Sequence, residues 1–390
     1  MGAETDVVVI GAGMAGAGIA AELSAGLNVV LIEQEAQPGH HATGRSAALH
    51  SEIYGNRVIR ALTRASRDFF LAGGDGAATY VRPRGCLHIA TPAQLERLDA
   101  FSMQPGVCTA MTRIDGARAR ELVPVLRPDT IVAALEERHA YDLDVDAIHS
   151  AFLARHRHNG GTLHLSSPVM ALERDWSGWI VRAGERTWRT RIVVNAAGAW
   201  GDTVARLAGL PPIGLQPRRR TACTVDAPEG TTPSAWPAVI DIDEQFYFKP
   251  EAGRILLSPA DETASEPCDA WPDELDLAIA VDRVQQVADI PVRRIAHSWA
   301  GLRTFVADKT PVVGFDPAAS GFFWLVGQGG YGIQTAPALS RLGANLVCGR
   351  AVPSDIADSG VAAADLAPER LDLNRQSQET SITHQGGSTS

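Results

Sequence analysis

The start of the chain carries the pattern that most constrains its fold. Four apolar residues at 7–10 read as a buried strand, and they run directly into the loop at 11–16, Gly-Ala-Gly-Met-Ala-Gly. Small and apolar residues at helical spacing follow, and a second apolar strand at 29–32 ends in Glu33. A lone glycine loop would indicate only a turn. Strand, glycine loop, helix, strand and acid in this order predict a dinucleotide-binding unit.

The residues of this unit each suit one part of a dinucleotide. Gly11 allows a tight turn, Gly13 lets the backbone approach a pyrophosphate, and Gly16 lets the helix pack closely against the strand. The helix N-terminus offers unpaired N–H groups and a partial positive charge to the phosphates. Glu33 can accept a hydrogen bond from a ribose hydroxyl. The unit predicts a dinucleotide without saying which one.

Composition excludes several classes of protein. At 390 residues the chain can form two domains, and 45% apolar with 21% charged residues is ordinary for a soluble globular protein. A net charge of −10 argues against a nucleic-acid partner and against adhesion to an anionic membrane. No apolar run is long enough for an integral membrane span, and the acidic N-terminus does not resemble a signal peptide.

The cysteines bear on the compartment and on metal binding. The five cysteines are dispersed and form no CxxC pair, which argues against a disulfide framework and a zinc site. We therefore expect a cytoplasmic protein. His149, His156 and His158 lie on or near one predicted helix but lack the spacing of metal ligands. We expect a solvated helix there and no metal site.

The rest of the chain alternates helical segments with short strands. The periodicity predicts helices at 58–71, over 93–123 and from about 146 to 158. Strands are predicted at 85–90, 162–165, 179–182, 187–190, 192–194 and 322–326, and 218–301 is rich in strands. From about residue 374 the composition is that of a disordered tail.

Glycine-bearing segments recur at the start, middle and end of the chain, with β-meanders between them. This arrangement predicts an α/β (α+β two-domain) protein. We expect a Rossmann-like domain assembled from the discontinuous segments 1–80, 145–217 and 302–370. An antiparallel β-sheet substrate domain would then comprise 81–144 and 218–301.

Six segments together resemble a known family. They are DVVVIGAGMAGAGIAAEL, VVLIEQEAQPG, GRSAA, VVNAAGAW, HSWAGLRTFVAD and GQGGYGIQTAP. In this order they resemble the FAD-dependent D-amino-acid oxidase superfamily, which includes glycine oxidase and sarcosine oxidase. Within that superfamily the chain most resembles bacterial D-arginine dehydrogenase, and the resemblance extends over nearly its whole length.

The resemblance implies that the dinucleotide is FAD. The second glycine loop, near the C-terminus, supports FAD independently, because a nicotinamide enzyme has no evident use for it. By the family's pattern, 329–335 places a helix N-terminus against the flavin pyrimidine, where it stabilises the anion formed on reduction. Family members that bind flavin covalently use a cysteine soon after the Gly-Leu-Arg segment, and 304–307 contains none. We therefore expect noncovalent FAD.

The resemblance also implies a set of cofactor residues. They are Gly11, Gly13, Met14, Ala15, Gly16, Glu33, Gln34, Thr43, Gly44, Arg45, Ser46, Ala47, Ala48, Val169, Ala197, Gly198, Trp200, Arg303, Gly329, Gly330, Tyr331, Gly332, Ile333, Gln334 and Thr335.

The substrate residues implied by the resemblance centre on Arg303. A planar guanidinium matches a carboxylate in geometry and charge, and Tyr54, Tyr247 and Arg220 match further residues at the substrate carboxylate. Two positions depart from the D-arginine dehydrogenase pattern. Its histidine falls on Leu49, which leaves His50 one position away as a substitute. Its acidic residue falls on Cys86. Without that carboxylate we expect D-arginine to be a poor substrate and neutral or apolar D-amino acids to be preferred.

The predicted activity is oxidative deamination of a D-amino acid. Hydride would pass from Cα to flavin N5, and the imino acid would hydrolyse to a 2-oxo acid and ammonia. Oxygen or a quinone would be the electron acceptor, and the sequence identifies no general base. Alternatives are an N-methyl or cyclic secondary amine, a 2-hydroxy acid, an FAD-bearing subunit of an electron-transfer assembly, or a flavin-dependent hydroxylase that needs a nicotinamide reductant.

Overall fold

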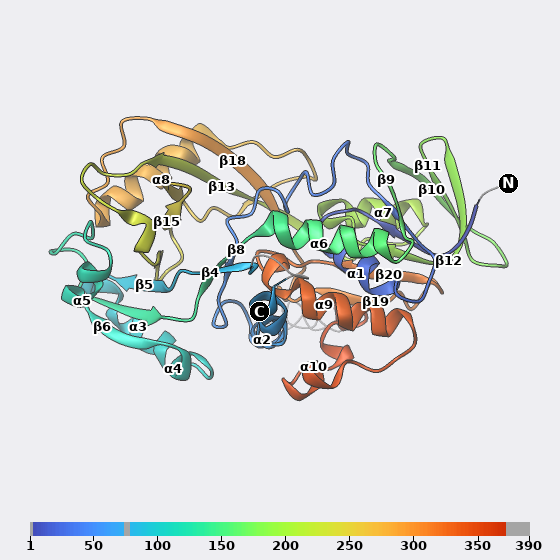
Figure 1. Ribbon diagram of the computed structural model, residues 1–390, viewed down its shortest axis with the longest axis horizontal. Coiled ribbons are helices and arrows are strands. Elements are labelled where there is room, and N and C mark those ends of the chain that lie inside the picture. The colour runs from blue at the N-terminus through green and yellow to red at the C-terminus, as the bar shows by residue number, and fades with distance from the viewer. Residues whose placement is uncertain (1–2, 74–78, 372–390) are drawn as a thin grey trace, which may run out of the picture.

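The computed structural model describes residues 3–73 and 79–371. The predicted disordered tail lies outside these residues. The chain forms two large sheets at opposite ends of an elongated molecule, with helices α2 (Arg57–Ala72) and α9 (Gly332–Val347) between them (Figure 1). The chain crosses between the sheets several times, so each sheet is assembled from distant segments. This is the mixed α/β architecture that the sequence predicts.

The first sheet contains the N-terminal strand at its centre. Its strands follow the order β10-β11-β12-β1-β2-β9, with β20 paired to β12 and β19 to β20. Strands β1, β2, β9, β12 and β20 pair in parallel, and residues 7–10 and 29–32 are buried because helices cover the sheet. The bounds are β1 Ala3–Ile10, β2 Val29–Ile32, β9 Thr162–His164, β10 Val169–Arg174, β11 Trp179–Ala183, β12 Arg186–Asn195, β19 Val312–Phe315 and β20 Phe322–Val326.

One prediction in this sheet is wrong in detail. The strands expected at 187–190 and 192–194 are a single strand, β12. Residues 188–195 pair with β1, residues 186–190 pair antiparallel with β11, and residues 193–195 pair with β20. Because the neighbouring strands of β12 change along its length, the burial pattern of its side chains also changes midway. In the sequence this change looks like a boundary between two separate strands.

Helices α6 (Val145–His158) and α9 both pack against α1 (Met14–Leu23), and all three pack against this sheet. The expectation of a solvated α6 is wrong for two of its histidines. His149 Nε2 lies 2.9 Å from the carbonyl oxygen of Ala12, and His156 Nδ1 lies 2.6 Å from Ser24 Oγ. Both histidines are buried and His158 is exposed. These two rings therefore join α6 to the first βα unit.

The second sheet has the order β17-β13-β16-β15-β14-β5-β7-β6, with β18 paired to β13. One face packs on helix α8 (Glu274–Val287) through residues such as Leu87, Phe248 and Val284, and the other face looks toward the first sheet. The bounds are β5 Cys86–Ala90, β6 Thr112–Asp115, β7 Ala133–Glu137, β13 Gln216–Asp226, β14 Ala238–Asp241, β15 Tyr247–Glu251, β16 Arg254–Ser258, β17 Thr263–Ala264 and β18 Ile295–Phe305.

The segment 93–123 is only partly helical. It contains α3 (Leu95–Ser102), α4 (Val107–Ala110) and α5 (Gly116–Leu122), but residues 112–115 form strand β6 at the sheet edge. Three of the four β6 residues are exposed, so the strand lacks the apolar alternation that would reveal it. Its pairing with β7 decides the conformation.

Short elements complete the described chain. Strands β3 (Leu49–His50), β8 (Tyr141–Leu143) and β4 (Val81–Pro83) form a small third sheet between the two large ones. The remaining helices are η1 Pro92–Gln94, η2 Gly198–Trp200, α7 Gly201–Leu207, η3 Pro233–Ala235, α10 Ser354–Asp358 and η4 Ala363–Asp365. Within residues 3–73 and 79–371 we find no helix with the length and hydropathy to cross a bilayer.

Candidate active site

The first glycine loop adopts a conformation that only glycine permits. Gly11 has a φ of +99°, and a Cβ there would lie 2.6 Å from the carbonyl oxygen of Ala196. A Cβ on Gly16 would lie 1.8 Å from the carbonyl oxygen of Gly11. The loop therefore folds back tightly against the start of α1. Because Gly11 and Gly16 carry no Cβ, the strand and the helix can approach each other this closely.

The carboxylate of Glu33 is tied to this loop. Glu33 ends the β2 segment and is buried, and its Oε2 accepts a hydrogen bond of 2.8 Å from the backbone N–H of Ala12. Its Oε1 accepts a second bond of 3.0 Å from the N–H of Glu35. A carboxylate has about four acceptor positions. Glu33 thus holds the loop and keeps acceptor capacity for a bound hydroxyl.

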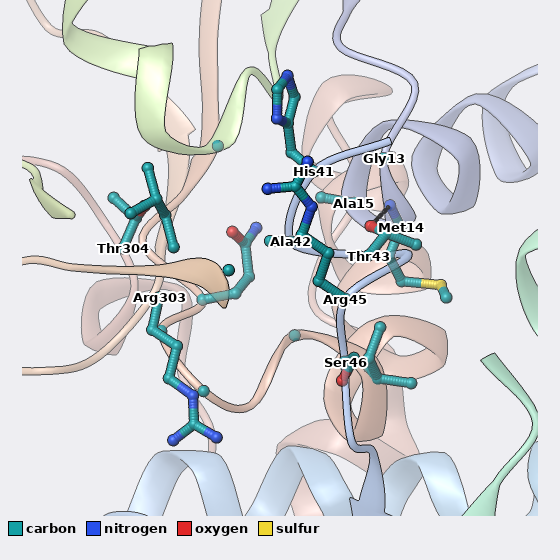
Figure 2. A pocket seen from close by; sticks show the side chains of 18 of the residues that line it. Gly13, Met14, Ala15, His41, Ala42, Thr43, Arg45, Ser46, Arg303 and Thr304 are labelled. Carbon is teal, nitrogen blue, oxygen red and sulfur yellow. Dashed lines mark hydrogen bonds between the residues drawn. The ribbon is translucent and has the colours of Figure 1, made fainter. Parts of the chain in front are cut away.

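The N-terminus of α1 is available to an anion. Its N-cap, Gly13, provides no side-chain cap within the described chain, and the first turn holds no acidic residue. The N–H of Met14 donates to Thr43 Oγ1 at 2.9 Å, which fastens the 41–46 loop beside the helix end (Figure 2). The helix N-terminus and this loop form one wall of a large cavity.

The second glycine loop approaches the same cavity from the opposite end of the chain. Gly329 has a φ of +56°, and a Cβ on it would lie 2.3 Å from the ring of Phe305. A Cβ on Gly330 would lie 3.0 Å from a guanidinium nitrogen of Arg303. Helix α9 begins here, and among the described residues no side chain caps it. The loop thus brings a helix N-terminus and an arginine to one place.

Most of the predicted site residues meet in this one cavity, although they come from all parts of the chain. At what we call the glycine-loop end and along the middle, the lining includes Gly11, Gly13, Met14, Ala15, Glu33, Gln34, Thr43, Arg45, Ser46, Ala47, Ala48, Val169, Ala197, Gly198, Trp200, Gly329, Gly330, Gly332, Ile333 and Gln334. At what we call the arginine end it includes Tyr54, Arg220, Tyr247 and Arg303.

Four predicted residues lie behind the lining and support it. Gly16 and Gly44 sit inside tight turns, where the N–H of Gly44 donates to the carbonyl of Gly39. Thr335 is buried in α9 and its hydroxyl donates to the carbonyl of Tyr331. The Tyr331 ring packs edge-on against the lining ring of Tyr54, with centroids 4.8 Å apart. These residues shape the cavity without facing it.

His50 does not line the cavity, whereas the sequence predicts a substrate residue there. Its ring is buried against Phe70, its Nε2 lies 3.3 Å from the carbonyl oxygen of Thr63, and burial lowers its pKa. Leu49 and Ser51, on either side of it, line the cavity. Alternation along β3 therefore turns His50 away from the site and its neighbours toward it.

The arginine end places two guanidinium groups close together. Arg303 Nη1 donates to the Tyr54 hydroxyl at 3.4 Å, and Arg220 Nε donates to the carbonyl oxygen of Asp261 at 2.7 Å. Burial lowers the pKa of Arg220, and the positive charge of Arg303 lowers it further. Figure 2 shows Arg303 across the cavity from the 41–46 loop. Two adjacent cations under a glycine backbone form a binding place for a carboxylate.

The second sheet covers one side of the cavity with residues that sequence reasoning did not identify, and we call this covering side the roof. His88, Ala238, Ile240 and Lys249 line the cavity from three neighbouring strands. Burial lowers the pKa of His88 to about 4, so this ring is neutral at neutral pH. Lys249 Nζ lies 2.8 Å from carboxylates of Asp142 and Glu251. No local motif marks these residues, because the sheet register alone puts them on one face.

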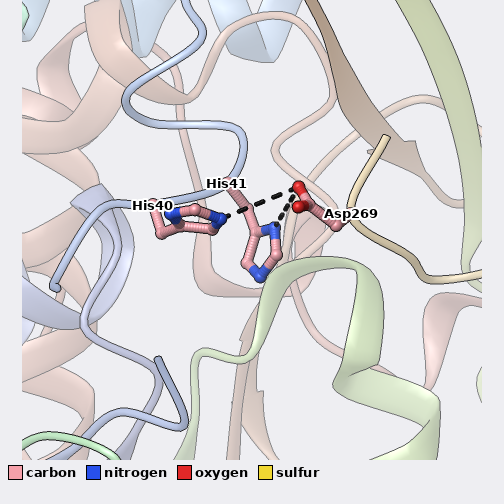
Figure 3. A group of neighbouring side chains, drawn as sticks. All are labelled: His40, His41 and Asp269. Atoms are coloured by element: carbon pink, nitrogen blue, oxygen red, sulfur yellow. Dashed lines mark ion pairs between the residues drawn. The ribbon is translucent and has the colours of Figure 1, made fainter. Parts of the chain in front are cut away.

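A polar cluster closes the cavity between the two sheets. One ligand-type atom from each of His40, His41 and Asp269 lies within 4.8 Å of the others (Figure 3). Arg45 pairs with Asp269, lowers the pKa of that carboxyl, and donates to the carbonyl oxygen of Ala270 at 2.8 Å. His41 Nε2 lies 2.9 Å from Glu35 Oε1. Because Arg45 already neutralises Asp269, the cluster needs no metal ion and joins the loop at 41–46 to the second sheet.

The sequence matches a single family along most of its length. Residues 6–346 match the family described as DAO, FAD dependent oxidoreductase. The bifunctional protein MnmC of tRNA 5-methylaminomethyl-2-thiouridine biosynthesis from Burkholderia vietnamiensis is 29% identical over 331 residues, which is 79% of this chain and 48% of that protein. Mitochondrial dimethylglycine dehydrogenase of Rattus norvegicus is 25% identical over 374 residues, 86% of this chain and 42% of that protein.

Solved structures agree on the fold. L-proline dehydrogenase from P. horikoshii superposes with a TM-score of 0.79 at 20% identity, covering 96% of this chain and 99% of that one. The chain spans only about a third to a half of the length of the curated relatives it matches. These likenesses establish the architecture, and they leave the reaction to be argued from the site.

Proposed function

Because this chain belongs to the DAO family of FAD-dependent oxidoreductases, we propose that it oxidises the α-carbon of an amino acid, with FAD as its cofactor. The observation that carries this proposal is Arg303. It lines the cavity, and the second glycine loop packs against its guanidinium. A fixed guanidinium beside the expected flavin position suits a substrate that carries a carboxylate next to the reacting carbon.

The residues present fit FAD. Glu33 keeps acceptor capacity for a ribose hydroxyl, and the N-terminus of α1 can hold a pyrophosphate. Near the second glycine loop, Gln334 lines the cavity, and its buried Nε2 has no hydrogen-bond partner among the described residues. An unpartnered buried donor is costly unless a ligand accepts from it. A flavin carbonyl oxygen is an acceptor of the required kind.

The protein's own part in the reaction is to bind and orient the substrate. Arg303 holds the carboxylate through two parallel N–H bonds, and the Tyr54 hydroxyl, 3.4 Å from Arg303, adds a further donor. Tyr247 and Arg220 line the same end. Bound FAD supplies the acceptor for the hydride equivalent that leaves the α-carbon. The product imino acid hydrolyses to a 2-oxo acid and ammonia.

We propose that the substrate is a D-amino acid with a neutral or apolar side chain. The D configuration rests on the resemblance to D-arginine dehydrogenase. The preference for an apolar side chain rests on the roof, where Ala238, Ile240 and a neutral His88 face the cavity. Glu244 also lines this end but is exposed, so water screens its charge. A buried guanidinium in such a pocket would lack a counter-charge, which costs several kcal/mol.

A second candidate is oxidation of a secondary or N-methyl amino acid. The printed names of two similar proteins, dimethylglycine dehydrogenase and L-proline dehydrogenase, favour it. The same arginine would hold the carboxylate, and only the amine substituent would differ. If the chain instead serves as an FAD-bearing subunit, the purified protein would be reduced by substrate but would turn over poorly without its partner.

An anaerobic substrate screen tests the proposal. The purified FAD-loaded protein is mixed with D-amino acids, L-amino acids, proline enantiomers and N-methyl glycines, and bleaching of the visible flavin band is followed. We expect D-methionine and D-leucine to bleach the flavin much faster than D-arginine. Reduction by L-enantiomers alone would overturn the D-specific proposal, and reduction by N-methyl compounds alone would favour the second candidate. Readmitting air or a soluble quinone then identifies the electron acceptor.

A further inference from the structure

A buried carboxyl group lies just behind the arginine end of the cavity. Glu137 ends strand β7 and is only 2% exposed. Its Oε2 accepts a hydrogen bond of 2.7 Å from Ser51 Oγ, and its Oε1 accepts one of 3.1 Å from the N–H of Glu52. No lysine or arginine is paired with it in the described chain. A buried acid held by one hydroxyl and one amide suits proton exchange better than fold stability.

Ser51 connects this acid to the substrate. Ser51 is 4% exposed and lines the main cavity. It is the first residue of the Ser51–Tyr54 turn, which places Tyr54 beside Arg303. Its backbone N–H donates to Gln334 Oε1 at 3.2 Å, which fixes it against the start of α9. One hydroxyl therefore separates Glu137 from the space where substrate binds.

On its other side Glu137 borders a second cavity. That cavity lies between α2 and α4, and its lining includes Glu137, Glu52, His139, Arg57, Arg60, Arg64 and Arg67. It is open enough to hold water next to the carboxyl. Glu137 therefore lies between the main cavity, which it reaches through Ser51, and a second, polar cavity.

The surroundings of Glu137 allow it to gain and lose a proton near neutral pH. Burial raises its pKa to about 7, the bonds from Ser51 and Glu52 N–H oppose this, and the Glu52 charge adds to it. Cys86 lies directly opposite on β5, and burial followed by the Glu137 charge raises the pKa of that thiol. The remaining ionisable neighbours are those of the second cavity, where Arg67 lies 3.7 Å from Glu52.

Four other groups of the cavity lining could accept a proton, but each is exposed or held by other contacts. Glu33 already accepts two backbone N–H bonds, and Glu244 is exposed. His40 and His41 lie in the cluster with Asp269. Arg303 and Arg220 are cations, and the pKa of His88, at about 4, makes it a weak base at neutral pH. An amino acid reaches the enzyme as an ammonium ion, however, and its nitrogen must lose a proton before the α-carbon can be oxidised. The structure offers one hydrogen-bonded way out for that proton.

We propose that Ser51 and Glu137 form a relay that removes the ammonium proton of the substrate. The substrate nitrogen gives one proton to Ser51 Oγ while Ser51 passes its own hydroxyl proton to Glu137 Oε2. One N–H and one O–H bond break, one O–H bond forms on each acceptor, and the amine keeps its electron pair. Glu137 becomes a neutral acid and later releases the proton to water in the second cavity.

The pH dependence of kcat/KM tests the relay. In the wild type, kcat/KM for the best amine substrate should rise to a plateau above about pH 7, where Glu137 is ionised. In Glu137→Gln it should fall by about 100-fold at pH 7 and keep rising with pH toward the pKa of the free substrate amine. Glu136→Gln, a change of the neighbouring strand residue that pairs with Arg138, should retain the wild-type profile.

Two further variants keep the test decisive if Glu137→Gln folds poorly. Ser51→Ala leaves the acid in place but breaks the relay, so it should reproduce the Glu137→Gln profile. Ser51→Thr retains a hydroxyl and should restore most of the plateau. FAD content from the visible spectrum shows that each variant keeps its cofactor site. A merely structural role would lower kcat/KM equally at every pH and leave the position of the rise unchanged.

The relay rests on the proposed amine oxidation, and different experimental results would contradict the relay and the oxidation. If the wild type oxidises no amine, the proposed function is wrong and the relay falls with it. If it oxidises an amine but Glu137→Gln and Ser51→Ala show the wild-type pH profile, only the relay is wrong.

Discussion

The two ends of the cavity are built in different ways. Around the first glycine loop, at the glycine-loop end, the important groups of residues 11–33 lie close together in sequence. Each has a backbone reason to be there, such as the φ of Gly11 or the N–H bonds to Glu33. At the arginine end, Arg303, Tyr247 and His88 come from different strands of one sheet, and register alone aligns them. The first end is encoded by local conformation and the second by pairing between distant segments. Substitutions at the two ends should therefore fail in different ways.

The largest effect is expected at the glycine-loop end. Gly16→Ala puts a Cβ 1.8 Å from the carbonyl oxygen of Gly11, so strand, loop and helix must separate. Overpacking of this kind costs about 3 kcal/mol or more, which weakens FAD binding by at least about 150-fold. The FAD-to-protein ratio from absorbance measures it. Gly26→Ala is the matched control, because no described heavy atom lies within 4 Å of its added Cβ. A Gly16→Ala protein with full FAD content would contradict the account.

The next effect belongs to the arginine end, and it should leave FAD in place. Arg303→Ala removes the fork that we propose holds the substrate carboxylate. This should cost about 2–5 kcal/mol in kcat/KM, mostly through weaker substrate binding. Arg303→Lys should recover only part of this, because an ammonium cannot bind bidentately. Arg218→Ala changes the residue paired with Arg303 on β13, which lies outside the lining, and serves as control. Equal loss of FAD and of activity would show that the two ends are not separable.

The carboxyl of Glu137, which lies behind the arginine end, should also change how the unfolding free energy depends on pH. The pKa of Glu137 is raised to about 7 in the folded protein from an ordinary 4.5, so the folded state binds the proton more tightly. The unfolding free energy of the wild type should fall by about 3 kcal/mol, through this group, as pH rises from about 4.5 through 7. The amide in Glu137→Gln does not titrate, so the variant lacks this pH-dependent fall in unfolding free energy. Urea unfolding at pH 5 and pH 8 should show the variant gaining on the wild type at the higher pH, whereas a constant difference would contradict the raised pKa.

The smallest effect is expected where the two ends are joined. Asp269→Asn removes the ion pair with Arg45 that fastens the 41–46 loop to the second sheet. Asp269 is half-exposed, so water screens the pair and the cost should stay below about 1 kcal/mol. Fluorescence titration with FAD should show a change in Kd of less than about fivefold, shrinking further at high salt. A change of 100-fold would mean that this contact, rather than the glycine loops, governs cofactor binding.

What could be predicted from the sequence divides in the same way, into features set by local conformation and features set by pairing between distant segments. The strand at 29–32, the strand at 322–326 and the helix after Gly332 could be predicted, because apolar runs and glycine signals are local. Strand β6 could not be, because its residues are exposed and its partner β7 decides its conformation. His50 was chosen by its nearness in sequence to a family position, yet a strand turns neighbouring side chains to opposite faces. The residues that reach the cavity there are Leu49 and Ser51.

The sequence by itself determined the two glycine loops, the acid at Glu33 and the arginine at 303, because backbone conformation and loop chemistry depend on adjacent residues. Only the tertiary structure decided that His149 and His156 are buried, that His88 forms part of the roof, and that Glu137 lies one hydroxyl from the main cavity. These placements depend on which strands pair and in which register. No short stretch of the chain contains that information.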